Sequence, residues 1–161
     1  MSNSRFTVDH VRLATDKPYE AVTTAFERQL GRFEPDVYKA LAASGDAERA
    51  RAKIEAMAGP SGFMLFDKID HGALLALTGQ SARAVQYVVG NPLYAIQMTR
   101  HNVAAGLYAP LRLLVYETKE GSTVMEYDQP SSLFGQYRDA RITPVAETLD
   151  RKLEALVAAA G

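Results

Sequence analysis

The chain has 161 residues, of which 47% are hydrophobic and 23% are charged, and its formal net charge at pH 7 is -1. This length accommodates one domain of ordinary size, and the composition is typical of a folded globular protein, which excludes a disordered chain. Because the sequence contains no cysteine, disulfides, zinc–thiolate centres, iron–sulfur clusters and cysteine nucleophiles are excluded, and the balanced charge argues against a nucleic-acid partner.

The N-terminus and the apolar stretches bear on localisation. The opening residues, MSNSRFTVDH, contain no apolar run of the roughly 7 to 15 residues that a signal peptide requires. The apolar stretches elsewhere are far shorter than the roughly 18 residues that span a bilayer. We therefore expect a cytoplasmic protein with no membrane partner.

A strand and a helix are predicted at the start of the chain. Residues 5–13 mix β-favouring and polar side chains, as in a half-buried strand. Asp16 is placed to cap a helix in whose first turn Pro18 is well tolerated. Apolar residues then recur at spacings of four up to Leu30, which predicts one buried helix face, and Gly31 closes the helix.

The next segment is predicted to be helical. Residues 35–43 and 46–57 are each typical of a short helix, and both end before Gly59 and Pro60. We interpret residues 32–60 as a helical insertion within a single domain that covers the whole chain.

Short apolar runs then predict strands. GFMLFD and ALLALT flank the turn-like residues 69–72, as in a hairpin, and AVQYVV follows Gly79. That run ends at Gly90-Asn91-Pro92, where Asn91 is a natural helix cap and Pro92 a preferred first helical residue. The helix is expected to end near His101.

The last third predicts a second hairpin and a terminal helix. LRLLVYE and STVMEY surround a glycine-containing turn at residues 119–121, and Thr143-Pro144 precedes a long apolar stripe that reaches Leu156. Two hairpins without a regular βαβ alternation predict an α+β fold. We expect an antiparallel sheet of about five or six strands with helices packed on one face.

Histidines are the residues best suited to acid–base chemistry near neutral pH. His10, His71 and His101 each adjoin an aspartate or asparagine, but no two have the spacing of metal ligands on one helix. We expect no metal, and we favour turn and helix-end roles for His71 and His101. The sequence also lacks GxSxG, P-loop and GxGxxG motifs.

The second hairpin and the tyrosines offer further candidate contacts. A three-residue loop would place Arg112 opposite Asp128, beside Tyr116, as a fork for an anion or as a cross-strand salt bridge, which we favour. Tyr87, Tyr94 and Tyr108 cluster in sequence about the two prolines. Tyrosines of this kind line amphipathic pockets, and they equally fit a core or a dimer interface. Of the three, we predict Tyr108 as a ligand contact.

Four stretches carry a family resemblance between Ser61 and about Leu156. They are GFMLFDKIDHG, QYVVGNPLYAIQM, AAGLYAPLRLLVYETKEGSTVMEYDQPSSLF and the closing LDRKLEAL. In combination they resemble the domain of unknown function family 302, and the opening segment 6–30 also fits. The resemblance implies an α+β fold and dimerisation, and it supplies neither an established activity nor a catalytic residue.

The leading functional hypothesis is a non-catalytic small-molecule-binding or sensing domain that acts as a homodimer and needs no cofactor. The candidate ligand contacts are His71, Asn91, His101, Tyr108 and Arg112. One alternative is a hydrolase or lyase that uses His71 or His101 as general base beside a carboxylate. Another is a structural module that binds a partner through the sheet edge or the terminal helix.

Overall fold

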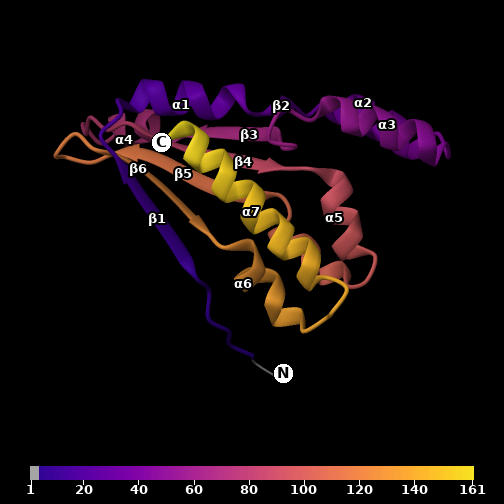
Figure 1. Ribbon diagram of the computed structural model, residues 1–161. Coiled ribbons are helices and arrows are strands. Elements are labelled where there is room, and N and C mark those ends of the chain that lie inside the picture. Colours follow the sequence, from indigo (N-terminus) through magenta and orange to yellow (C-terminus); the bar gives the residue numbers. More distant parts are fainter. Residues whose placement is uncertain (1–3) are drawn as a thin grey trace.

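A six-stranded sheet runs through residues 4–161, the part of the chain that the computed structural model describes (Figure 1). Its strands are β1 (His10–Thr15), β2 (Gly31–Arg32), β3 (Met64–Asp70), β4 (Ala84–Gly90), β5 (Leu111–Glu117) and β6 (Thr123–Asp128). They lie in the order β1-β6-β5-β4-β3-β2, and all neighbours are antiparallel except β2 and β3. The predicted α+β class is confirmed, with a mostly antiparallel sheet that gains one short parallel pair.

Helices occupy most of the connections between strands. They are α1 (Tyr19–Arg28), α2 (Pro35–Ala43), α3 (Ala47–Met57), α4 (His71–Ala76), α5 (Pro92–Thr99), α6 (Pro130–Phe134) and α7 (Thr143–Ala160), with 3-10 turns η1 (Val103–Tyr108) and η2 (Gly135–Tyr137). No helix within residues 4–161 is long and apolar enough to cross a bilayer.

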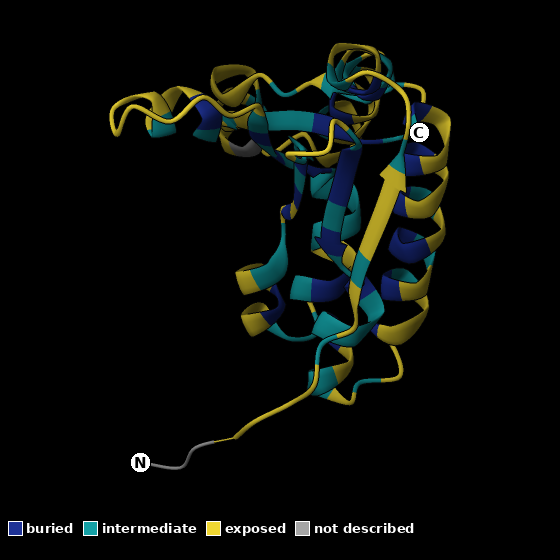
Figure 2. Ribbon diagram, turned by 90° about the vertical axis from the view of Figure 1, so that its left-hand side faces the viewer, coloured by how far each residue is buried: buried dark blue, intermediate teal, exposed yellow. Residues whose placement is uncertain are grey.

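The main core lies between the sheet and the helices α1 and α7. Phe26 of α1 packs on Tyr87 of β4 with ring centroids 4.8 Å apart, and Met125 of β6 lies against the end of α7. Side chains alternate along a strand, so the helices cover the face that carries Tyr87 and Leu113. Figure 2 shows that α7 likewise has one buried side, which faces the sheet, and one exposed side.

Two glycines close the base of the helical segment. A Cβ on Gly59 would lie 2.3 Å from the backbone nitrogen of Gly31, so only glycine allows the two backbones to meet. Both amides donate to the carbonyl of Phe63, at 2.9 and 3.0 Å. The residues between them therefore leave and rejoin the sheet at one point, and Figure 1 shows α2 and α3 projecting beyond α1.

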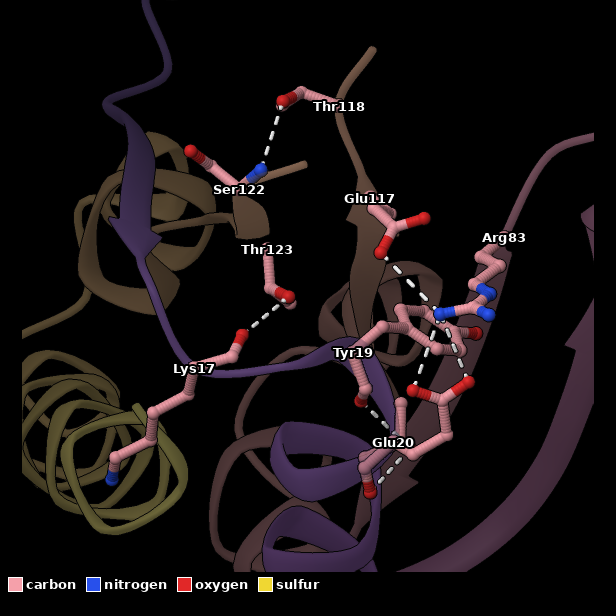
Figure 3. A network of polar contacts seen from close by, with 9 residues as sticks. Lys17, Tyr19, Glu20, Arg83, Glu117, Thr118, Ser122 and Thr123 are labelled. Carbon is pink, nitrogen blue, oxygen red and sulfur yellow. Dashed lines mark hydrogen bonds and ion pairs between the residues drawn. The ribbon is translucent and has the colours of Figure 1, made fainter. Parts of the chain in front are cut away.

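A polar network fixes the turn from β1 into α1 at the other end of the sheet (Figure 3). The guanidinium of Arg83 contacts the carboxylates of Glu20 at 3.0 Å and Glu117 at 3.4 Å. The hydroxyl of Thr123 donates to the carbonyl of Lys17 at 2.8 Å. These contacts hold the start of α1 and the preceding Lys17 against β5, β6 and the residue that precedes β4.

Several predicted elements are confirmed. Residues 35–43 form α2 as predicted, and α3 begins one residue after Asp46, whose carboxylate accepts from the amide of Arg49. The β5–β6 hairpin closes around Gly121, which has a positive φ of 91°. The terminal helix buries its predicted stripe against the sheet.

The first predicted hairpin is wrong. Residues 73–78 form most of α4 and the turn after it, because Asp70 accepts from the amide of Ala73 at 2.9 Å and so starts a helix. β3 pairs instead with β4. The apolar run was too short to separate a strand from a helical turn by periodicity.

The first strand, both ends of the first helix and the start of the terminal helix also differ from prediction. The first strand covers 10–15 rather than 5–13, since its register is set by pairing with β6. Pro18 is the N-cap of α1, with no side-chain hydrogen bond from Asp16, and Gly31 belongs to β2. Ile142, not Thr143, is the N-cap of α7.

Candidate functional site

An apolar cavity lies where β4 ends and α5 begins. It has a volume of about 200 Å³ and is lined from six separate parts of the chain. Its aromatic walls are Phe33, Tyr38, Phe66, Tyr94 and Phe134. We call this space, whose lining also includes Asn91, the aromatic cavity. Concave, largely apolar spaces with a few fixed polar groups are where proteins bind small molecules.

One wall of the aromatic cavity is a stack of rings. Phe33, which follows β2, stacks on Phe66 of β3 with centroids 4.3 Å apart and an interplanar angle of 30°. Tyr38 of α2 packs against Phe33 at 5.4 Å. The helical segment that starts after β2 thus completes a wall whose other side belongs to the sheet.

Asn91 is the amide-bearing residue of the lining, and both ends of its side chain are used within the protein. Its Oδ1 accepts from the amide of Leu93 at 2.9 Å, which confirms the predicted cap of α5. Its Nδ2 donates to the carbonyl of Gly62, also at 2.9 Å. The side chain is therefore held in one orientation and joins α5 to the loop before β3.

The end of β4 is closely packed around Gly90. A Cβ on Gly90 would lie 3.2 Å from Cβ of Pro110 and 3.4 Å from a ring carbon of Phe66. Gly90 therefore lets the ring of Phe66 and the Pro110 loop approach each other beside the cavity. The predicted Gly-Asn-Pro signal marks this junction correctly.

The other predicted ligand contacts are dispersed. His71 is the first residue of α4, near the start of β4 rather than its end. His101 follows α5, and Arg112 is exposed on β5. Tyr108 does not line the aromatic cavity, but its ring lies edge-on to Phe134, with centroids 6.1 Å apart. Of the five candidates, the structure places Asn91 in the lining and Tyr108 directly behind it.

The carboxylates near Arg112 pair with the first strand instead. His10 Nδ1 lies 2.8 Å from Asp128, and the guanidinium of Arg12 lies 3.0 Å from Glu126. The hairpin register, which sets Leu113 opposite Tyr127, places positions 112 and 128 opposite each other as predicted. The predicted salt bridge is wrong, because β1 lies beside β6 and within residues 4–161 His10 is the ion-pair partner of Asp128. This pairing joins the two ends of the chain and has no local signal in the sequence.

This cluster shifts the ionisation of its members. The hydrogen bond to Asp128 and the weaker one to Glu126 raise the pKa of His10 above its usual value. The hydroxyl of Tyr116 donates to Glu126 at 2.7 Å and holds the pKa of that carboxyl below its usual value. The cluster joins the edge strand β1 to β6. Among residues 4–161 no group of three or more acidic or histidine side chains is placed to hold a metal ion.

A second polar contact was missed in the sequence. The buried Tyr87 donates its hydroxyl to Glu27 at 2.6 Å, and the ammonium of Lys68 lies 2.6 Å from the same carboxylate. Burial and the neighbouring carboxylate raise the pKa of Tyr87. Burial opposes the ionised form of Glu27, yet the hydrogen bonds from Lys68 and Tyr87 hold its pKa below the usual value. Tyr87 is thus a core residue, whereas Tyr94 lines the aromatic cavity.

The sheet, its helical cover and the cavity at the β4–α5 junction define an α+β domain with an aromatic-walled cavity. The chain belongs to the family described as "Domain of unknown function DUF302", whose profile matches residues 38–160. The predicted resemblance is confirmed.

A solved relative has the same fold. It is described as "Crystal structure of uncharacterized conserved protein DUF302 from Bacillus stearothermophilus". The two structures superpose with a TM-score of 0.66 at 18% sequence identity, over 94% of this chain and 98% of that chain. No curated protein matches the sequence.

Proposed function

We propose that this protein is a non-catalytic small-molecule-binding domain and that its ligand places one ring in the aromatic cavity. The carrying observation is a cavity of about 200 Å³ with aromatic side chains on several sides. A dry apolar cavity of roughly 150 Å³ is large enough to bind benzene. The cavity in this protein therefore fits one six-membered ring with a short substituent.

The chemistry of the lining favours binding over catalysis. Among residues 4–161, those that line the cavity include no histidine, carboxylate, lysine or serine, and the amide of Asn91 is already engaged. A general base must come within hydrogen-bond reach of the group it deprotonates. The alternative enzyme, with His71 or His101 as base, would need a different site. A binding role is therefore the simpler use of this cavity.

Filling the cavity tests the proposal. We expect phenol and p-cresol to raise the melting temperature of the wild-type protein, because a ligand that binds only the folded state stabilises it. Ala95→Leu adds a larger side chain to the lining and is expected to abolish the shift. Ala52→Leu makes the same change at an exposed position of α3 and is the control. No shift in the wild-type protein, or an undiminished shift in A95L, would refute the proposal.

We also propose that the domain is a homodimer, as the family resemblance implies. Large apolar side chains on α5 and η1 support this: Ile96 is 59% exposed, Val103 84% and Leu107 78%. Exposed apolar side chains gathered in one region are typical of protein interfaces. Light scattering should report about twice 17.6 kDa, and the double change Val103→Asp with Leu107→Asp should halve that mass. A monomeric wild-type protein at micromolar concentration would contradict the proposal.

A further inference from the structure

A second space lies between α7 and the loop that precedes β3. It has a volume of about 370 Å³. We call it the basic cleft, and it is lined by Gln29, Pro60, Ser61, Thr148, Arg151 and Lys152 among others. Its lining holds two cations and no carboxylate, and within residues 4–161 neither cation forms an ion pair. The chemistry of this cleft suits an anion.

Lys152 connects the basic cleft to the aromatic cavity. Its ammonium donates to the carbonyl of Ser61 at 3.1 Å and lies 5.6 Å from the ring centroid of Tyr94. Tyr94 is itself a wall of the aromatic cavity. Leu149, another lining residue, lies three positions before Lys152 on α7 and hence on the same side of that helix. The two spaces are therefore neighbours with a cation at their boundary.

The same loop joins the polar residues of both spaces. The carbonyl of Gly62 accepts from Asn91 at 2.9 Å, one residue after the carbonyl that accepts from Lys152. Gly62 has a positive φ of 81°, and a Cβ there would lie 2.7 Å from the lysine Nζ. The loop backbone thus fixes both the amide of Asn91 and the lysine ammonium, and it leaves room for that ammonium beside it.

The present partners of Lys152 are neutral. A backbone carbonyl and the face of a tyrosine satisfy an ammonium only partly, whereas a carboxylate forms a shorter and stronger charge-assisted hydrogen bond. Arg151 is exposed and directly precedes Lys152 on α7, and it adds a second positive charge at the basic cleft. A ligand with its ring in the aromatic cavity gains most if it presents an anion toward this boundary.

We propose that the ligand class of this protein is a single-ring aromatic acid, with the ring in the aromatic cavity and the acid group on Lys152. This inference rests on the proposed binding function and names its chemistry. Arg151 reinforces the attraction without touching the ring. The neutral amide counterpart of such an acid can only accept an ordinary hydrogen bond from Lys152, so it binds more weakly.

Phenylacetate and phenylacetamide separate the two contributions, because they share a ring and a linker and differ in charge. Calorimetric titration of the full chain at pH 7 and low salt should find phenylacetate roughly three- to tenfold tighter than phenylacetamide. Lys152→Met keeps the apolar stem and should remove this preference, because it lowers the affinity for phenylacetate much more than the affinity for phenylacetamide. Lys119→Met, in the exposed β5–β6 turn, removes the same charge elsewhere and should retain the preference.

Arg151→Met provides a second variant at an exposed position, where loss of folding is not expected, and it should reduce the preference in part. Equal affinities for the two probes in the wild-type protein would overturn the aromatic-acid proposal and leave the ring-binding function standing. A preference that survives in K152M would overturn it as well. Failure of both probes to bind would overturn the proposed function itself.

Discussion

Replacement of Asn91 by aspartate is the sharpest test of how the β4–α5 junction is held. A residue that served only as a helix cap would tolerate this change, since aspartate caps about as well as asparagine and its charge favours a helix N-terminus. The structure gives Asn91 a second role, because its Nδ2 donates to the carbonyl of Gly62 at 2.9 Å. In N91D that donor becomes an acceptor facing another acceptor.

The magnitude follows from these two contacts. The cap on the amide of Leu93 survives, and the new charge adds about 0.3–1 kcal/mol in favour of the helix. Against this, the partly buried carbonyl of Gly62 loses its partner, which costs about 1–3 kcal/mol, and it faces a carboxylate as well. We expect the repulsion between the carboxylate and the carbonyl to offset the gain at the helix N-terminus, so that the net loss in the free energy of unfolding is about 1–3 kcal/mol. That loss corresponds to a fall of roughly 2–10 °C in melting temperature for a domain of this size.

Urea unfolding at pH 7 of the wild-type protein, N91D and N91S measures this loss. Asn91→Ser also keeps a capping oxygen but cannot bridge to Gly62, so its loss should resemble that of N91D without the charge effect. An N91D protein as stable as the wild type at pH 7 would refute the second role of Asn91.

Three further changes probe contacts elsewhere. Asp128 and Glu126 raise the pKa of His10 in the folded protein, so the stabilising effect of His10 is complete below the unfolded pKa of about 6.5 and is lost as the pH rises through the raised pKa. The gap in melting temperature between the wild-type protein and His10→Gln should therefore close above neutral pH. A gap that stays constant with pH would contradict this. Gly59→Ala places a Cβ 2.3 Å from backbone atoms and should lower the free energy of unfolding in urea by at least about 3 kcal/mol. The control Gly135→Ala lies in open space with a helical φ of -59° and should cost nothing. Equal effects would be evidence against the close approach of the Gly31 and Gly59 backbones. Asp150→Ala leaves the side-chain amide of Gln129 and the backbone amide of Ser131 without their acceptor, and it should lower the free energy of unfolding by about 2–3 kcal/mol. A loss below about 0.5 kcal/mol would indicate that water replaces the carboxylate.

The elements that the sequence predicted well carry strong local signals. The Asn91-Pro92 pair marks the start of α5, Asp46 marks the start of α3, and a glycine turn marks the β5–β6 hairpin. Each signal satisfies backbone groups within a few residues, so no distant partner is needed to interpret it. The α+β class follows from these local units.

The errors arise where distant partners decide. β1 takes its register from β6, more than 100 positions away, and this pairing gives His10 and Arg12 their carboxylates. The run ALLALT satisfies the apolar requirement of a strand, yet the cap at Asp70 and the direct pairing of β3 with β4 make it helical. Local composition is the same for both outcomes, and only the register of the finished sheet selects one.

Of the candidate site, the sequence predicts Asn91 but not the aromatic residues around it, because these residues too are brought together by contacts between distant segments. Asn91 has a recognisable capping signal, whereas the rings around it come from the segment after β2, from β3, α5 and α6, and carry no common spacing. Phe33 and Phe66 meet because Gly31 and Gly59 bring the helical segment back to the sheet. Composition gives the number of aromatic residues but not which of them share a wall.

The loop between Gly59 and β3 links the fold to the proposed binding chemistry. Its backbone meets Gly31 at one end and accepts from Asn91 and Lys152 at the other. Side chains that would contact a ring and an acid are therefore held by main-chain groups rather than by each other. Groups fixed in this way lose little conformational freedom when a ligand arrives, which favours affinity. A change in the loop backbone should consequently affect the aromatic cavity and the basic cleft together, whereas a change of a single side chain should affect one of them.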